Sequence, residues 1–354
     1  MVWQALQEAS YSSRPRSTLG TEAAPGAPAG EVVHAAASAS ASKVLRRIRK
    51  ALLRIRCRER FIPHNIPPFM PSGHNPVRGA LWMSAAVLSF AIMAIAVREL
   101  LRHMGILEIL FWRTAVALVI AGMVVVRHGA RTVRTRRLPL HATRALVHLG
   151  GQFCWMYAIG ALTLATVFAI EFTMPVWTAL LAVAFLGERM SANRVVMLVF
   201  GLVGIGIILR PGVGHFHPAA LVMLFGALLY AGNIIFTKSL SATDSAIGVT
   251  FWMSTVQAPI TLAAAWPGWV MPYAVDIPWI AGIGAGSFAA HYSMTRAMKH
   301  ADATVVVPID FTRLPLIAVV GAIFYGEPFD PMVLVGAAVI FAGTYYSLRR
   351  EAHR

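Results

Sequence analysis

Charged residues are scarce in this sequence. Asp, Glu, Lys and Arg make up 13% of the 354 residues, and hydrophobic residues make up 57%. Soluble globular domains contain roughly a quarter charged residues. A chain this poor in charge lacks the polar side chains needed to cover a water-exposed surface. The composition therefore excludes an ordinary soluble domain and favours a protein whose main partner is the lipid bilayer.

Cysteine is equally scarce, and no metal-binding motif is present. Cys57 lies in a basic segment and Cys154 in an apolar one, so two residues so placed exclude a disulfide framework. His215 and His217 stand close together without a third ligand nearby, and we interpret them as loop residues. We expect no metal and no cofactor.

Acidic residues are half as frequent as basic ones, which gives a net charge of +16. A basic protein sometimes binds nucleic acid, but here Lys and Arg fall mainly beside the apolar segments. Positive charge in that position controls the orientation of membrane spans. We therefore expect no nucleic-acid partner.

Residues 1–77 differ from the rest of the chain. Ser, Ala, Pro and Gly dominate to about position 42, and a basic run follows from Lys43 to Arg60. We expect a disordered tail. The basic run either lies on an anionic membrane surface as an amphipathic helix or is simply solvated. The tail also resembles a transit peptide in composition, and an alternative start at Met70 would leave it outside the protein.

Ten apolar segments follow, each long enough to span a bilayer. Ten spans put both termini on one side of the membrane, and the loops on that side carry 26 Lys and Arg against 3 on the other. We expect a multi-pass protein of the plasma membrane, the inner membrane in a bacterium, with both termini in the cytoplasm. The spans are predicted near 79–97, 106–126, 145–162, 164–186, 194–209, 218–237, 247–266, 278–295, 303–325 and 331–348.

Two parts of the sequence match at a nearly constant offset. Residues 171–173 (Glu-Phe-Thr) correspond to residues 310–312 (Asp-Phe-Thr), and a Gly-Glu pair ends 17 positions after each acid. Phe-Trp at 111–112 corresponds to Phe-Trp at 251–252. The alternative is chance similarity of apolar helices. The matches predict two repeats, 78–210 and 217–348, each of five spans; because five is odd, the repeats are inverted.

Together with this architecture, Leu-Gly-Glu-Arg after the fourth span and Tyr-Gly-Glu-Pro after the ninth resemble the drug/metabolite transporter superfamily, specifically its EamA-domain branch. The resemblance covers residues 79–348. It implies a carrier that exports or imports amino acids, metabolites or drugs, with protons or by exchange. We expect a monomeric or homodimeric secondary transporter of a small organic solute, an exporter coupled to protons or exchange, working by rocking of its two halves.

Four ionisable residues within the predicted spans stand out: Arg113, Glu171, Asp310 and Arg313. Charges in a bilayer are costly and usually functional, so we expect these residues to bind the solute or the coupling ion. Asp310 and Arg313 are three apart and share a helical face. Glu171 lacks such a neighbour, and we expect Arg113 to replace it. The alternative is that both pairs only neutralise buried charge.

Other residues have weaker but specific predictions. Trp112 and Trp177 are candidates for lining a solute cavity. We expect bends or gates at three prolines and two helix-end acids: Pro175, Pro308, Pro315, Glu188 and Glu327.

Rival functions also follow from the sequence. Ser287 and His291 are four apart in the eighth span, as an intramembrane serine protease would require of a nucleophile and its base. Small residues around them are equally typical of helix packing. A channel or a membrane scaffold is the other alternative. We expect no enzymatic activity.

Overall fold

In the computed structural model, every regular element of the described residues is a helix. The description covers 75–186, 190–210, 217–241, 243–301 and 303–352; the predicted tail, up to residue 74, and Glu188 lie outside it. The elements are α3 (Pro76–Leu100), α4 (Ile106–His128), η2 (Ala130–Val133), α5 (Leu138–Ala161), α6 (Leu164–Glu171), α7 (Met174–Leu186), α8 (Ala192–Leu209), α9 (Ala219–Ser241), α10 (Ala246–Ala265), η3 (Trp266–Gly268), α11 (Ile277–His300), α12 (Ala303–Phe311), α13 (Arg313–Tyr325) and α14 (Pro331–Ala352).

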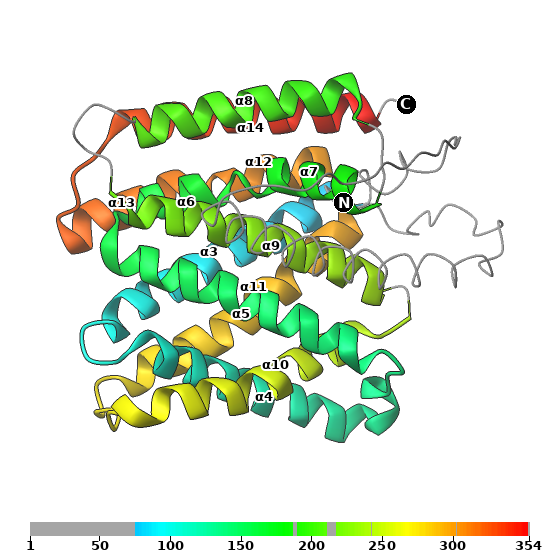
Figure 1. Ribbon diagram of the computed structural model, residues 1–354, viewed down its shortest axis with the longest axis vertical. Coiled ribbons are helices and arrows are strands. Elements are labelled where there is room, and N and C mark those ends of the chain that lie inside the picture. The colour runs from blue at the N-terminus through cyan, green and yellow to red at the C-terminus, as the bar shows by residue number, and fades with distance from the viewer. Residues whose placement is uncertain (1–74, 187–189, 211–216, 242, 302, 353–354) are drawn as a thin grey trace, which may run out of the picture.

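The helices form ten crossings of one bundle, because α6 continues into α7 and α12 into α13 (Figure 1). Eight crossings are long and apolar enough to span a membrane. The other two, α5 and α11, lie among them and have 24 residues each. In α5, His141, Arg144 and His148 are buried on one face, whereas Leu146 and Phe153 are exposed. The polar face points into the protein, so an all-α membrane fold of ten helices is confirmed.

Two helices extend beyond the spans predicted for them. Helix α5 begins at Leu138, before the predicted start near 145, and α11 ends at His300, after the predicted end near 295. Both predicted ends were set at basic residues, which are expected to face water. Arg144 is instead buried within α5, where it donates to the Thr237 hydroxyl (2.6 Å).

The two repeats run in opposite directions. Arg137 at the start of α5 donates to the carbonyl of Ser239, near the end of α9 (2.7 Å). Arg98, near the end of α3, donates to the carbonyl of Ile159 at the other end of α5. The equivalent helices α3 and α9 therefore end on opposite sides of the bundle. We call these sides the η2 end, which holds η2 and the α9–α10 connection, and the α13–α14 end, which holds that connection.

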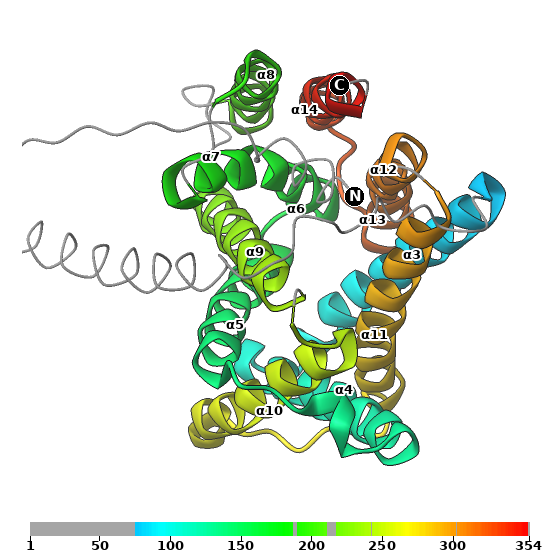
Figure 2. The same ribbon diagram turned by 90° about the vertical axis from the view of Figure 1, so that its right-hand side faces the viewer.

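Helices of one repeat pack mainly against helices of the other. The principal pairs are α3 with α11, α5 with α9, α4 with α10 and α8 with α14, as seen along the bundle in Figure 2. The α8–α14 pair approaches so closely that a Cβ at Gly204 would lie 2.6 Å from the carbonyl oxygen of Gly336. Neither repeat therefore packs as a separate unit in this conformation, and the rocking of the two sequence halves stays a prediction.

Hydrophobic packing differs between the two ends. One large cluster joins the helices in the half nearer the α13–α14 end, with Leu100, Ile159 and Leu164 among its fully buried members. Nearer the η2 end the described residues form smaller, separate clusters, the largest confined to α3, α11 and α12. The bundle is thus packed across its width at the α13–α14 end, and in separate groups at the η2 end.

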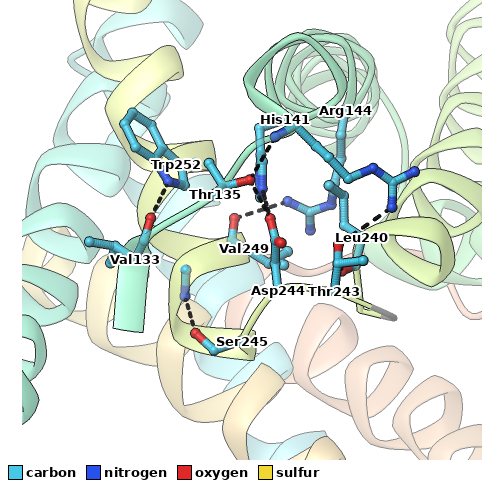
Figure 3. Close-up of polar contacts among 12 residues, drawn as sticks. Val133, Thr135, His141, Arg144, Leu240, Thr243, Asp244, Ser245, Val249 and Trp252 are labelled. Carbon is cyan, nitrogen blue, oxygen red and sulfur yellow. Dashed lines mark hydrogen bonds and ion pairs between the residues drawn. The ribbon is translucent and has the colours of Figure 1, made fainter. Parts of the chain in front are cut away.

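Polar contacts at the η2 end connect the α4–α5 and α9–α10 segments (Figure 3). We call Thr135, His141, Asp244 and Trp252 the η2-end cluster. One carboxylate oxygen of Asp244 lies 2.6 Å from the Thr135 hydroxyl and 2.6 Å from His141 Nε2. Trp252 donates to the carbonyl of Val133 (2.8 Å). These bonds fasten α4, α5, α9 and α10 together.

The ionised form of Asp244 is stabilised by its neighbours. Burial opposes its ionisation, but hydrogen bonds from Thr135, His141 and Thr243 outweigh that effect, so its pKa lies below the ordinary value. A lowered pKa in the folded state gives stability that is present above the unfolded-state pKa and is lost as pH falls through the folded-state pKa.

We expect Asp244→Ala to lower the free energy of unfolding by about 1–3 kcal/mol, because it leaves buried donors unsatisfied. Asp244→Asn retains an acceptor and should cost less. Thermal unfolding in detergent between pH 8 and pH 3 measures both effects. The difference between wild type and Asp244→Ala should persist down to pH 5 and shrink below about pH 4. A difference that disappears between pH 7 and pH 6 would contradict this account of Asp244.

Candidate functional site

Two helices are broken near the middle of the bundle, at equivalent positions in the repeats. The α6–α7 break follows Glu171, and the α12–α13 break lies at Thr312. Pro175 and Pro315 follow the breaks, and each lacks the N–H that would bond to the carbonyl four residues earlier. The Glu-Phe-Thr and Asp-Phe-Thr matches therefore mark the two points where helical hydrogen bonding stops.

Threonine side chains satisfy backbone groups at both breaks. The Thr173 hydroxyl donates to the carbonyl of Ile170 (2.7 Å), and the Thr312 hydroxyl donates to the carbonyl of Ile309 (2.6 Å). The same two carbonyls accept the backbone N–H groups of Thr173 and Thr312, so each threonine bonds twice to the last turn before the break. In a bilayer such contacts within the protein replace water at an interrupted helix. This role of the threonines was not predicted from the sequence, although they belong to the matched segments.

Equivalent phenylalanines meet at the centre. Phe172 and Phe311 stack with ring centroids 4.1 Å apart and an interplanar angle of 15°. Since the two residues occupy the same position in inverted repeats, the axis relating the repeats passes between their rings. Glu171 and Asp310 precede these residues and so lie close to that axis.

Three of the four predicted charged residues come together here, and we call Glu171, Asp310 and Arg313 the central cluster. Arg313 Nη2 lies 3.3 Å from Glu171 Oε1, and its Nε lies 3.7 Å from Asp310 Oδ1. The Trp155 indole donates to the other oxygen of Glu171 (2.9 Å). One cation is therefore shared between two acids, leaving a formal charge of −1 when both acids are ionised.

Aromatic rings surround Arg313. Its guanidinium carbon lies 4.6 Å from the ring centroid of Phe90 and 5.0 Å from those of Phe168 and Phe172. Cation–π contacts of this kind stabilise a cation away from water. They hold the guanidinium between the two acids, on a side chain that is 5% exposed.

The expected pairing of Arg113 with Glu171 is wrong. Arg113 Nη2 donates to the Ser287 hydroxyl of α11 (2.7 Å), and Glu171 pairs with Arg313 of the other repeat. The prediction paired residues of the same repeat. In the structure, the interlocked helices bring Arg113 and Glu171 each to a partner from the other repeat.

Ser287 and His291, the predicted nucleophile and base, meet through a different contact. His291 Nδ1 lies 2.8 Å from the backbone carbonyl oxygen of Ser287, not from its hydroxyl. The hydroxyl instead accepts from Arg113. A guanidinium cannot act as the general base that a serine nucleophile requires.

The two candidate tryptophans lie apart. Trp177 donates to the Thr173 hydroxyl (3.1 Å) and so supports the α6–α7 break. Trp112 lies 5.8 Å, centroid to centroid, from Trp269, which follows η3 toward the α13–α14 end. The tryptophan against Glu171 is Trp155. Pro308 lies within α12, before Asp310.

Glu327 connects three parts of the structure at the α13–α14 end. It accepts from Arg98 of α3 and from the backbone N–H of Leu164 (2.8 Å), the first residue of α6. A carboxylate is well placed at a helix N-terminus, where backbone donors are free. Together with the Arg98–Ile159 bond, these contacts hold α3 against α5 and α6 at this end.

Comparisons with known proteins agree with this architecture. An S-adenosylmethionine uptake transporter of Rickettsia bellii (strain RML369-C) is 26% identical over 273 residues, 77% of this chain and 94% of its own. A riboflavin transporter of Rhizobium johnstonii is 29% identical over 78% of this chain and 93% of its own. A pseudopaline exporter of Pseudomonas aeruginosa is 24% identical over 74% and 93%.

A solved crystal structure shows the same fold, with a TM-score of 0.55 over 78% of this chain and 98% of its own, at 16% identity. The model of the EamA-like transporter family matches residues 77–210 and again residues 217–349. These two matches cover most of the chain and correspond to the two inverted groups of helices. The chain belongs to the EamA-like transporter family.

Proposed function

We propose that the chain is a secondary transporter that moves a small organic solute by alternating access, with the central cluster as its solute and coupling site. The observation that carries this proposal is the placement of Glu171, Asp310 and Arg313 at two broken helices beside the axis of the repeats. Broken helices near the midplane are typical binding sites of inverted-repeat carriers.

The relatives support a small solute but differ in what they move and in direction. Their names specify S-adenosylmethionine uptake, riboflavin transport and pseudopaline export. Alternating access is reversible, and the available gradients set its direction. We retain export, coupled to protons or to exchange, as the proposed mode.

The packing suggests a pair of units for the proposed motion. Helices α3, α11, α12 and α13 contact one another and form one bundle; their repeat equivalents α9, α5, α6 and α7 form the other. The α4–α10 pair lies along one edge and the α8–α14 pair along the opposite edge (Figure 2). We propose that these two mixed bundles, each drawn from both repeats, change their relative tilt during transport.

The present conformation is closed at the α13–α14 end. Arg98 and Glu327 connect the two bundles there, and the large hydrophobic cluster is continuous. Basic residues are concentrated in the loops of the η2 end, so we propose that this end faces the cytoplasm. The conformation would then be closed toward the outside.

The repeats also suggest how the other end closes. In sequence, Arg98 corresponds to Lys238, and Glu327 corresponds to Glu188. Inverted repeats exchange their roles when a carrier changes sides. We therefore propose Glu188, which lies outside the described residues, as a gate residue on the basis of its sequence equivalence to Glu327.

The central cluster offers a reason for coupling. Two carboxylates share one guanidinium, and an uncompensated negative charge is costly in a low-dielectric interior. A proton or a cationic group of the solute would neutralise it. Tyr230 of α9 lies within electrostatic range of both Glu171 and Arg313 and is the further titratable group near the cluster.

We expect Glu171→Gln and Asp310→Asn each to reduce solute flux about tenfold or more, since each removes a charged hydrogen bond or ion pair worth about 1.5–3 kcal/mol. Comparing metabolites between cells lacking and overproducing the protein identifies the solute, and proteoliposome flux at several pH values then measures the effect. Asp330→Asn, in an exposed ion pair with Arg210, is the matched control. Unchanged pH-dependent flux in both folded variants would exclude the carboxylates as coupling groups.

We expect Arg98→Met to open the α13–α14 end. The reporter is Ala169→Cys, at a fully buried α6 position near the centre, in a Cys57→Ser, Cys154→Ser background. Labelling of intact cells by a membrane-impermeant thiol reagent should rise severalfold over the parent. Lys238→Met removes the equivalent cation at the other end and should not raise labelling. Equal labelling of both variants would contradict the proposed gates.

A further inference from the structure

Arg113 is a buried cation whose described contacts include no carboxylate. It lies within α4, its side chain is buried, and its one hydrogen bond is to the neutral hydroxyl of Ser287 (2.7 Å). A guanidinium has five N–H donors. Most of the five donors of Arg113 are therefore left without an acceptor among the described residues. Its positive charge is left without a carboxylate partner there.

Three other arginines of the described residues differ from Arg113 in this respect. Arg98, Arg210 and Arg313 each form an ion pair with an acid. Arg144 also has neutral partners, but it lies near the start of α5 and belongs to the contacts of the η2 end. Arg113 is placed deeper, about two turns into a crossing of 23 residues.

A charge at this depth has an energetic cost. An arginine near the centre of a membrane helix makes insertion of that helix less favourable. The local packing nevertheless holds Arg113 in place, because α4 and α11 approach closely one turn away. A Cβ added to Gly284 of α11 would lie 2.4 Å from the side chain of Val116. The contact brings Ser287 to the guanidinium without supplying a counter-ion.

We propose that Arg113 and Ser287 form a subsite for a carboxylate group of the transported solute. The planar guanidinium matches a carboxylate through two parallel hydrogen bonds. The Ser287 hydroxyl adds a third donor when the carboxylate replaces it as the partner of Arg113. This inference rests on the proposed function, since it assigns a chemical class to the solute of that carrier.

The subsite is complementary to the central cluster. Arg113 supplies an uncompensated positive charge, whereas Glu171 and Asp310 exceed the single charge of Arg313. The two regions adjoin through Phe90, whose ring centroid lies 4.6 Å from the guanidinium carbon of Arg313 and 5.9 Å from the ring centroid of His291, one turn from Ser287. A solute with a carboxylate at one end and an amine at the other would neutralise both, which is the charge pattern of an amino acid.

Thermal unfolding of the purified full-length protein tests the subsite with a matched pair of probes, benzoate and benzamide, at tens of millimolar. They have the same ring and similar size but differ in charge. Benzoate should raise the melting temperature of the wild type by about 3 °C more than benzamide does. Arg113→Gln should lose this difference, and Arg113→Lys should retain part of it. Arg127→Gln removes an exposed charge from the end of the same helix and should respond as wild type.

Equal effects of benzoate and benzamide on the wild type, or an unchanged benzoate effect in Arg113→Gln, would overturn the proposal. A second measurement covers a variant that fails to fold. The solutes whose cellular levels depend on the wild-type protein should carry a carboxylate. If these solutes carry no anionic group, the subsite is rejected but the proposed transport function is not. If no solute level depends on the protein, the proposed function itself is rejected.

Discussion

The structure depends on one constraint: inside a bilayer, backbone groups and charges must find their partners within the protein. Unbroken helices meet this constraint by themselves, and most crossings are of that kind. The α6–α7 and α12–α13 crossings are not, because a proline follows each central acid. Thr173 and Thr312 bond to nearby carbonyls there, and Arg313 lies between the acids. The Arg313–Glu171 ion pair therefore joins the two repeats at the point where a helix of each repeat is interrupted.

The backbone follows the repeat symmetry more closely than the charges do. Phe172 stacks on its equivalent Phe311, and the main helix pairs occur as equivalent sets. The position equivalent to Arg313 is Met174, however, and the position equivalent to Arg113 is Met253. Arg313 pairs with both acids, whereas Arg113 pairs with neither. Symmetric packing is compatible with the two end states of the proposed mechanism, while the unequal charges make the central region polar.

Much of the fold could be predicted because its signals are local. Apolar length predicted ten crossings, and the offset between the two acids predicted inverted repeats, as the helix directions confirm. The predicted bounds of α5 and α11 were too short because a basic residue was taken to mark a helix end, whereas Arg144 faces the interior. Gln152 and His148 follow it at helical spacing, and that stripe of polar residues was the available signal for a longer α5.

The candidate site was only partly predictable for a different reason. Asp310 and Arg313 are neighbours on one helix, so their ion pair follows from spacing. The contacts Arg313–Glu171 and Arg113–Ser287 join different repeats, and helical periodicity carries no information on which helix lies opposite. The interlocked packing that hides these partners also underlies the proposed motion. Because each bundle contains helices of both repeats, the proposed change of tilt would displace Glu171 and Asp310 with different bundles. The guanidinium of Arg313 would move with Asp310, so its contact with Glu171 is the bond that this motion would stretch, and a solute or proton replacing the contact would lower the barrier to the change.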